Sequence, residues 1–545
     1  MNKFLMYLLE NKWVISNLKS YSYTYGLLFL LIIGGLLRFY NLNWDAPFYF
    51  HPDERNIASV ISESDSLFSV IFKSTFSYGN LPIIAISALK HFIQFLGLPI
   101  DNPFAFSTIL LRVWSASWSV GTLIMIYKIG KIWSSKVALT ATILSVFSVG
   151  FIQHAHYGTV ESFVTFWITV SFFCLIKLSR TNKKMILFLS IISLSIASAA
   201  KINMLSFYLL HKLVIFIFLP ITLKRKIVLF ISTSAILIFF TLLLSPYYTT
   251  ENFFSMLLYE RGVVSGSVPV FYTSPFYDSL SVLYQFEKIF PFLINPILTI
   301  LFLPSMIYVG IVAVKHKNKK YILILLAFLI TFIPQTVLFT KWSRYLIPCL
   351  PFLYIILALF IVRASKFIHN SSKSLAYTFY ISIVATCILF GYSYLHTVLL
   401  SPDSRIAASV WAQENIKDDS SIVSEVYDPG IMPFQGQFPS ITFFDTYTID
   451  QQENSGKFYE VLHNNDYVIL PSQRILSSRI QNASQFPNGN KFYTHILDPH
   501  HYSLIYTTPC DIFCTILYLG DPIYRFEETS LVFDRPTVQI FERIQ

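Results

Sequence analysis

Residues 23–40 read YTYGLLFLLIIGGLLRFY, an almost unbroken apolar run that ends in an arginine and two aromatic residues. Its length approaches the roughly 20 apolar residues that a helix needs to cross the hydrocarbon core of a bilayer. It ends at Arg38-Phe39-Tyr40 and not at a small-residue cleavage site, so we interpret it as a retained anchor and not as a signal peptide. Similar runs recur as far as His396, which predicts a polytopic α-helical membrane protein.

The composition and the placement of charge support the same fold class. The chain is 54% hydrophobic and 13% charged, with a mean hydropathy of +0.57, values that exclude an ordinary soluble enzyme. The net charge of +10 lies in short basic clusters at every second loop, the pattern of cytoplasmic loops and not of a nucleic-acid-binding surface. Before Val398, every acid except Glu10 falls in the alternate loops.

These patterns predict about eleven transmembrane helices. An odd number places the N-terminus in the cytoplasm and the C-terminus outside, and we expect a prokaryotic inner membrane, although an endoplasmic reticulum membrane also fits. The predicted spans start near Tyr23, Phe106, Val137, Glu161, Met185, Asn203, Ile227, Asn295, Tyr321, Tyr345 and Ala376.

The chain divides into two predicted domains, residues 1–397 in the membrane and residues 398–545 outside it. From Val398 charged residues become frequent and long apolar runs stop. This C-terminal domain reads as α/β, with helices at 404–414 and 455–463 and strands at 421–426, 466–470, 502–507 and 537–541. Cys510 and Cys514 fall within it, and a disulfide between them would suit an external location.

Two long loops are predicted on the outer side, at residues 41–105 and 247–290. The first long loop contains Phe50-His51-Pro52-Asp53-Glu54 and two short apolar stretches, near Leu67 and Leu81, that we expect to lie as helices along the membrane surface. Adjacent carboxylates repel one another and do not help a span to pack. Although most loop acids are only solvated, ionisable residues at a membrane site are functional by default, and a carboxylate can accept a proton from a hydroxyl.

A second polar segment is Gln153-His154-Ala155-His156-Tyr157-Gly158-Thr159-Val160-Glu161. It forms a short turn before the fourth predicted span. A carboxylate at that position could simply favour the helix N-terminus, but the density of polar side chains favours a pocket. The spacing of the two histidines is not diagnostic of a metal site, and we predict none.

Four cations, Arg38, Arg112, Lys201 and Arg344, lie in or beside apolar spans near the outer face. An unpaired cation there costs about 3 kcal/mol or more, so each needs an anion. That anion is either a carboxylate such as Asp53, Glu54 or Glu161, or a lipid-linked phosphate. The segment from Lys341 to Pro348, which holds Lys341, Arg344 and Tyr345, is the best phosphate candidate.

Taken together, these motifs resemble the polytopic GT-C glycosyltransferases. The likeness is to the protein O-mannosyltransferases that use dolichyl-phosphate-mannose and to the bacterial aminoarabinose transferases that modify lipid A, and it covers roughly residues 20–400. Asp53-Glu54 matches the acidic motif of the first outer loop in that superfamily. The histidine-rich segment ends in Glu161 where the family often has Asp. Arg112, Lys201, Arg344, Tyr345 and Pro348 also match.

The resemblance implies transfer of a sugar from a polyprenyl-phosphate donor to a hydroxyl of a protein, glycan or lipid acceptor, with inversion. Asp53, Glu54 and Glu161 would be catalytic. The implied donor-phosphate ligands are Arg344, Lys201, Arg112 and Lys341, and the implied substrate contacts are His51, His154, His156 and Tyr345. No cofactor is required, although a divalent cation remains open. The alternatives are a transporter or flippase for a lipid or glycan, or a membrane scaffold, but ionisable residues of transporters usually lie near the bilayer midplane.

Overall fold

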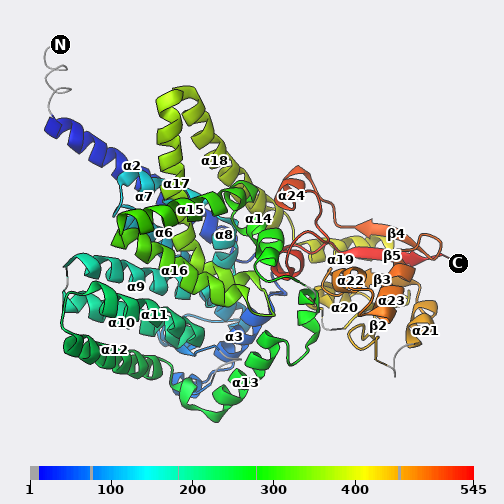
Figure 1. The fold of residues 1–545 in the computed structure, drawn as a ribbon. Coiled ribbons are helices and arrows are strands. Elements are labelled where there is room, and N and C mark those ends of the chain that lie inside the picture. Colours follow the sequence, from blue (N-terminus) through cyan, green and yellow to red (C-terminus); the bar gives the residue numbers. More distant parts are fainter. Residues whose placement is uncertain are drawn as a thin grey trace.

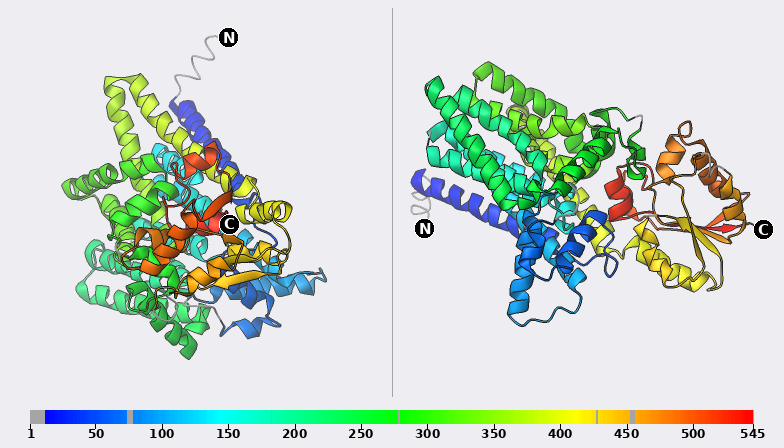
Figure 2. Two further views of the ribbon diagram at one scale, coloured as in Figure 1. Left: turned by 90° about the vertical axis from the view of Figure 1, so that its right-hand side faces the viewer. Right: turned by 90° about the horizontal axis from the view of Figure 1, so that it is seen from below.

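A computed structural model of the chain describes residues 12–73, 78–181, 183–277, 279–426, 428–451 and 456–544. A bundle of apolar helices forms one part and a smaller sheet domain lies at one end of it, on the side away from the start of α2 (Figures 1 and 2). The helices of the bundle are α2 (Lys12–Phe39), α6 (Pro103–Gly130), α7 (Ser135–Val146), α8 (Val149–His156), α9 (Glu161–Thr181), α10 (Lys184–Ala200), η1 (Ile202–Phe207), α11 (Tyr208–Leu213), η2 (Val214–Phe218), α12 (Leu223–Leu244), α15 (Pro296–His316), α16 (Lys319–Thr336), η6 (Ser343–Cys349), α17 (Leu350–Ser371), α18 (Lys373–Tyr394) and η7 (Leu395–Leu400).

Seven helical segments among the described residues are long and apolar enough to cross a membrane. They are Pro103–Gly130, Glu161–Ser179, Leu223–Leu244, Pro296–His316, Lys319–Thr336, Ser343–Ser371 and Lys373–Leu400. The pair α7 and α8 also qualifies, although it is bent by 54°. Three shorter apolar helices, at Tyr23–Phe39, Lys184–Ala200 and Ile202–Phe218, coincide with the other predicted spans. A multi-pass helical protein is therefore confirmed, while the count of eleven spans stays a prediction.

The first long loop folds into three helices: α3 (Pro52–Ser62), α4 (Leu67–Val70) and α5 (Leu81–Phe95). The two helices expected near Leu67 and Leu81 are thus present as α4 and α5. Exposed Phe68, Phe92 and Phe95 give α4 and α5 the apolar surface expected of helices that rest on a membrane. Lys90 of α5 is buried and donates hydrogen bonds to the carbonyls of Ile61, Ser62 and Ser64, which ties α5 to the end of α3.

The second long loop folds into a series of helical segments, of which α13 (Glu251–Ser265) is the longest. Its other elements are η3 (Pro246–Thr249), η4 (Phe271–Phe276), η5 (Gln285–Ile289) and α14 (Phe290–Leu293). Helix α13 lies beside the first long loop at the edge of the bundle (Figure 1).

The C-terminal domain is a five-stranded mixed sheet in the order β2-β1-β3-β5-β4. Strands β1 and β2 and strands β1 and β3 run parallel, whereas β5 is antiparallel to both β3 and β4. Its elements are α19 (Ser404–Asn415), β1 (Ile422–Glu425), η8 (Pro429–Ile431), α20 (Met432–Gln435), β2 (Ile441–Phe444), α21 (Lys457–His463), β3 (Tyr467–Leu470), α22 (Leu476–Gln481), α23 (Pro487–Leu497), β4 (Tyr502–Thr507), α24 (Ile512–Leu517), η9 (Thr529–Asp534) and β5 (Gln539–Arg543).

Successive side chains along a strand point to opposite faces of the sheet, and both faces are buried. Val423, Val468 and Phe541 belong to one apolar cluster, and their neighbours Ile422 and Ile540 belong to another. The predicted strands and both helices are present. Strand β2 was not predicted, because it is a four-residue edge strand whose burial does not alternate strongly.

The segment that connects β4 to β5 leaves the sheet domain before β5 completes the sheet. Between β4 and β5 it returns to the helical bundle, where Leu517, Tyr518, Phe526 and Phe533 pack into the same apolar core as the spanning helices. Cys510 and Cys514 form a disulfide at the start of this segment. This returning segment therefore belongs to the core of the bundle, whereas the sheet keeps two apolar clusters of its own.

Candidate active site

A cavity of about 830 Å³ lies where the first long loop, the ends of the helices and the C-terminal domain meet. Side chains from both long loops and from both domains line it. They include Asp53, His51, Tyr78, His154, Glu161, Lys201, Glu260, Arg261, Arg344, Tyr345, Arg474, Glu528 and Phe533. The cavity thus gathers residues that lie far apart in the sequence and carry both signs of charge.

Asp53 lies in the first turn of α3, where the local sequence favours a carboxylate. Pro52 occupies the first helical turn, and the Nδ1 atom of His51 caps the helix by accepting a hydrogen bond from the Glu54 amide at 3.4 Å. The positive end of the helix dipole stabilises an anion at this position. Tyr78 donates a hydrogen bond to Asp53 at 3.3 Å, and Arg344 forms an ion pair with the same carboxylate. The Asp53 side chain is 16% exposed, so it remains open to the cavity.

Arg344 approaches Asp53 from the short helix η6, which precedes α17. Its guanidinium lies over the ring of Trp342, 4.7 Å from the centroid, and near the ring of Tyr345, at 5.8 Å. These cation–π contacts fix the guanidinium at the cavity wall.

A second ion pair, between Lys201 and Glu161, lies in the same wall with 2.9 Å between Nζ and Oε1. Glu161 begins α9, and Lys201 stands at the break between α10 and η1, where the backbone is extended. The Lys201 ammonium also lies 5.2 Å from the centroid of the Tyr345 ring. Both charged groups are largely withdrawn from solvent, with 10% of the Lys201 side chain and 1% of the Glu161 side chain exposed.

The backbone of the first long loop is joined directly to Lys201. Tyr78 and Lys201 form an isolated antiparallel bridge, and the Gly79 amide donates to the Ala200 carbonyl at 3.0 Å. This contact places Tyr78, and with it Asp53, against the Lys201–Glu161 pair.

His51 and His154 are the two predicted histidines that line the cavity. Burial lowers the pKa of His51 to about 4, so this imidazole is neutral at pH 7. His154 is 2% exposed, and neither of its ring nitrogens has a hydrogen-bond partner among the described residues. Within the described ranges, the ring nitrogens of His154 are therefore polar atoms at the cavity wall without a hydrogen-bond partner.

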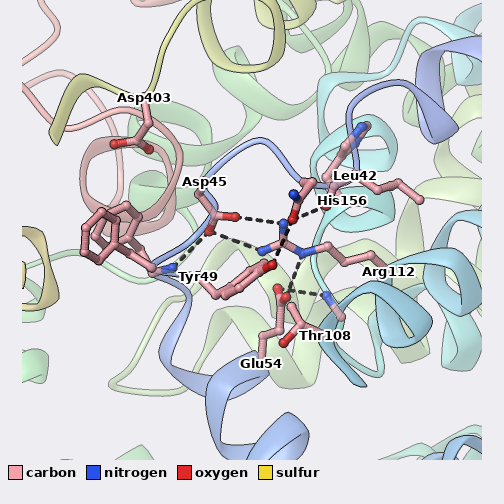
Figure 3. Close-up of polar contacts among 12 residues, drawn as sticks. Leu42, Asp45, Tyr49, Glu54, Thr108, Arg112, His156 and Asp403 are labelled. Atoms are coloured by element: carbon pink, nitrogen blue, oxygen red, sulfur yellow. Dashed lines mark hydrogen bonds and ion pairs between the residues drawn. The ribbon is translucent and has the colours of Figure 1, made fainter. Parts of the chain in front are cut away.

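Glu54, predicted as catalytic, and Arg112, predicted to bind the donor phosphate, are not among the residues that line the cavity. They contact each other instead (Figure 3). Arg112 Nε lies 2.6 Å from Glu54, and Arg112 Nη1 lies 2.8 Å from Asp45, with all three side chains almost fully buried. The Gly158 amide also donates to Glu54 at 3.1 Å. Adjacent residues of a helix point about 100° apart, so Asp53 faces the cavity while Glu54 faces the protein. The Asp45–Arg112–Glu54 cluster anchors the loop.

His156, predicted to contact substrate, and Lys341, predicted to bind the donor phosphate, are also not among the residues that line the cavity. Both nitrogens of His156 lie 2.8 Å from backbone carbonyls, those of Ile152 and Tyr40. Lys341 Nζ donates to Ser279 and to the Phe339 carbonyl, each at 2.9 Å. Each side chain has its polar atoms bound within the protein and so serves the fold.

Several cavity residues were not predicted. Glu260 and Arg261 come from α13, and Arg474, Glu528 and Phe533 come from the C-terminal domain. Arg474 and Glu528 form an ion pair of 2.5 Å at the wall. The only signal in the sequence was the adjacent pair Glu527-Glu528, which repeats the pattern of Asp53-Glu54.

The arrangement is suited to a reaction that moves a proton while an anion departs. Asp53 is a carboxylate open to the cavity, and Arg344 and Lys201 supply positive charge beside it. No three His, Cys, Asp or Glu side chains of the described ranges converge as a metal site would require.

Residues 94–256, from the end of α5 into α13, match the family described as dolichyl-phosphate-mannose-protein mannosyltransferase. The matched segment contains Glu161 and Lys201. The match confirms the resemblance that the motifs predicted. No curated protein sequence matches the chain.

Two solved structures are similar in outline. The oligosaccharyltransferase of Archaeoglobus fulgidus in its apo form is 12% identical, with 97% of this chain and 89% of that chain covered and a TM-score of 0.49. ArnT from Cupriavidus metallidurans bound to undecaprenyl phosphate is 9% identical, with 94% and 97% covered and a TM-score of 0.45.

Proposed function

We propose that this protein is a membrane glycosyltransferase that moves a sugar from a polyprenyl-phosphate donor to a hydroxyl group of an acceptor on the outer face of the membrane. The observation that carries the proposal is the cavity in which Asp53 lies beside Arg344, close to the Glu161–Lys201 pair. The match of residues 94–256 to a mannosyltransferase family supports it.

In the proposed reaction, the acceptor oxygen attacks the anomeric carbon of the sugar from the face opposite the phosphate. As the new C–O bond forms, the hydroxyl proton passes to the carboxylate of Asp53, and the bond between the anomeric carbon and the phosphate oxygen breaks. The bonding electrons leave with the polyprenyl phosphate. A single displacement of this kind inverts the configuration at the anomeric carbon.

The departing phosphate gains negative charge, which Arg344 and Lys201 are placed to stabilise. Arg344 is paired with Asp53 and Lys201 with Glu161, so a phosphate that binds either cation competes with a carboxylate. Glu161, His51, His154 and Tyr345 line the same cavity, and we assign them to contacts with sugar and acceptor hydroxyls. Glu54 and Arg112 hold the Asp53 loop in place and do not contact substrate.

We also propose the predicted topology, with about eleven spans, a cytoplasmic N-terminus and an external C-terminal domain in a prokaryotic inner membrane. The Cys510–Cys514 disulfide supports an external C-terminal domain because disulfides persist in oxidising compartments. The proposed reaction needs no nucleotide, because the donor carries its own leaving group, and we expect activity to persist in the presence of EDTA.

The test is mass spectrometry of membranes that contain the protein, supplied with a panel of polyprenyl-phosphate sugars and compared with membranes that contain Asp53→Asn. We expect sugar to appear on a protein, glycan or lipid with the wild type and not with Asp53→Asn. Glu63→Gln is the matched control, because Glu63 is an exposed acid at the other end of α3. Transfer that persists in Asp53→Asn would refute the assignment of the base.

A further inference from the structure

The segment that returns from the sheet to the bundle ends in η9, directly behind the loop that carries Asp53. All of η9 is buried. Ser343, the neighbour of Arg344, donates to the Thr529 hydroxyl at 2.9 Å, and Arg405 of α19 donates to the carbonyls of Val532 and Phe533 at 3.2 Å each. The position of η9 is therefore fixed from both the bundle and the C-terminal domain.

Asp534, the last residue of η9, links this segment to three places in the bundle. Its carboxylate accepts hydrogen bonds from Gln153 at 2.7 Å, from Tyr394 at 2.9 Å and from the hydroxyl of Tyr157. Asp534 is 2% exposed and forms no ion pair among the described residues, so these donors are what compensate its burial. Loss of the carboxylate would remove the acceptor of the hydrogen bond that the Tyr157 hydroxyl donates.

Tyr157 and the next residue, Gly158, in turn contact His51 and Glu54, which flank Pro52 and Asp53 in the chain. The ring centroid of Tyr157 lies 4.4 Å from that of the His51 imidazole, which also packs against Phe533 at 4.8 Å. Gly158 donates its amide to Glu54. His51 caps α3 and Glu54 lies in its first turn, so the geometry of the Asp53 carboxylate depends on both contacts.

A further contact comes from the C-terminal domain. The guanidinium of Arg405 lies over the ring of Phe50, 3.7 Å from its centroid. Phe50 and His51 are thus both held by residues from beyond position 400, immediately ahead of Asp53 in the chain.

We propose that Asp534 is a positioning residue for Asp53, which it orients through Tyr157 and His51, so that the C-terminal domain is part of the catalytic unit. This inference rests on the proposed function. Asp534 does not line the cavity and does not act as an acid or a base in the reaction. Misplacement of a reacting group by as little as an ångström can lower a rate roughly a hundredfold, so a small relaxation of the loop is sufficient for a large effect.

The decisive comparison is between Tyr157→Phe and Tyr394→Phe. Each variant removes one hydroxyl that donates to Asp534, but only Tyr157 contacts His51. With a polyprenyl-phosphate mannose as donor and native membranes as the acceptor source, we expect Tyr157→Phe and Asp534→Asn to lower kcat roughly tenfold with little change in donor KM. We expect Tyr394→Phe to stay within about twofold of the wild type. Equal losses in the two tyrosine variants would overturn the proposal.

Hydrogen exchange at residues 50–56 provides a readout that does not depend on turnover. We expect faster exchange there in Asp534→Asn and Tyr157→Phe than in the wild type. Asp466→Asn is the control, because Asp466 is an exposed acid of the C-terminal domain that contacts Ser421 and Arg543 only within that domain. Unchanged exchange in folded variants would overturn the proposal. If the wild type transferred no sugar, the proposed function would fail while the exchange data still decided the role of Asp534.

Discussion

The carboxylate of Asp53 is paired with the guanidinium of Arg344, which lies 291 positions further along the chain. In the proposed reaction these two groups have separate tasks, since one accepts a proton and the other stabilises the phosphate. Their pairing means that a donor phosphate bound at Arg344 would displace Asp53 and leave its carboxylate free to accept the proton. Binding of the donor and release of the base are therefore coupled.

This coupling predicts the behaviour of Arg344 variants. Arg344→Gln removes the cation, and we expect kcat to fall by about 10²–10³-fold, the usual loss when one stabilising group is removed from a site of developing charge. Arg344→Lys should recover part of the activity, because it restores the charge without the planar guanidinium. Steady-state kinetics with a polyprenyl-phosphate sugar would measure both variants. Full activity in Arg344→Gln would remove this residue from the mechanism.

We expect substitutions of Arg112 to lower the stability of the folded protein and not to slow one particular step of the reaction. Arg112→Met leaves Asp45 and Glu54 buried without the cation that neutralises them, and breaking a buried ion pair in this way costs about 3–5 kcal/mol. We expect a low yield of folded protein and a lower thermal midpoint in detergent. Arg225→Met is the matched control, because Arg225 is exposed at the start of α12. Equal thermal midpoints for the two variants would contradict the anchoring role.

The Lys201–Glu161 pair allows stability and activity to be separated. Lys201→Met leaves the Glu161 carboxylate buried and unpaired, with an expected loss of about 3–5 kcal/mol. Adding Glu161→Gln removes the stranded charge, so the double variant should regain much of its thermal midpoint. It should remain inactive, because both groups line the cavity. A double variant that transferred sugar at the wild-type rate would show that the pair serves only the fold.

Stability should fall as the pH falls from about 6.5 to about 4, in part because of His51. Burial lowers its pKa to about 4, so in this range the unfolded chain binds a proton that the folded protein does not. The folded state loses up to about 3 kcal/mol across the window, and the loss is absent above pH 7. His51→Asn keeps a capping acceptor without the titratable ring. Thermal midpoints at pH 7 and pH 5 should differ less in this variant than in the wild type, and an unchanged difference would refute the assignment.

The positions of the helices were predictable from the sequence because the length of an apolar run is a local property. The pairing of buried cations was predictable for a similar reason, since a charge in an apolar span requires a partner. Three of the four cations pair with expected carboxylates, Arg112 with Glu54, Lys201 with Glu161 and Arg344 with Asp53, and Arg112 also pairs with Asp45, which was not expected. The expectation was wrong for Arg38, which forms no ion pair among the described residues and instead donates to Ser119 and to backbone carbonyls.

The roles of the neighbours Asp53 and Glu54 were not separable in the sequence. Which of two adjacent acids faces a cavity depends on the rotation of α3, and that rotation is set by Arg112, Tyr157 and Phe533 from distant parts of the chain. The contribution of the C-terminal domain to the cavity was missed for the same reason. Arg474 and Glu528 resemble any pair of surface charges until the return of η9 places them at the cavity wall.

Gly79 provides the most stringent test of how the first long loop meets the bundle. A Cβ atom on Gly79 would lie 1.9 Å from the Ala199 carbonyl oxygen and 2.5 Å from the Tyr248 hydroxyl, closer than any non-bonded contact allows. In Gly79→Ala the loop must therefore move away from Lys201, which breaks the bridge that brings Tyr78 to Asp53. We expect a loss of stability of about 1–3 kcal/mol and a much larger loss of transfer, because the base would no longer face the two cations. Gly310→Ala is the control, since a Cβ there meets nothing within 4 Å. Wild-type transfer by Gly79→Ala would show that the contact between Tyr78 and Lys201 does not set the position of Asp53.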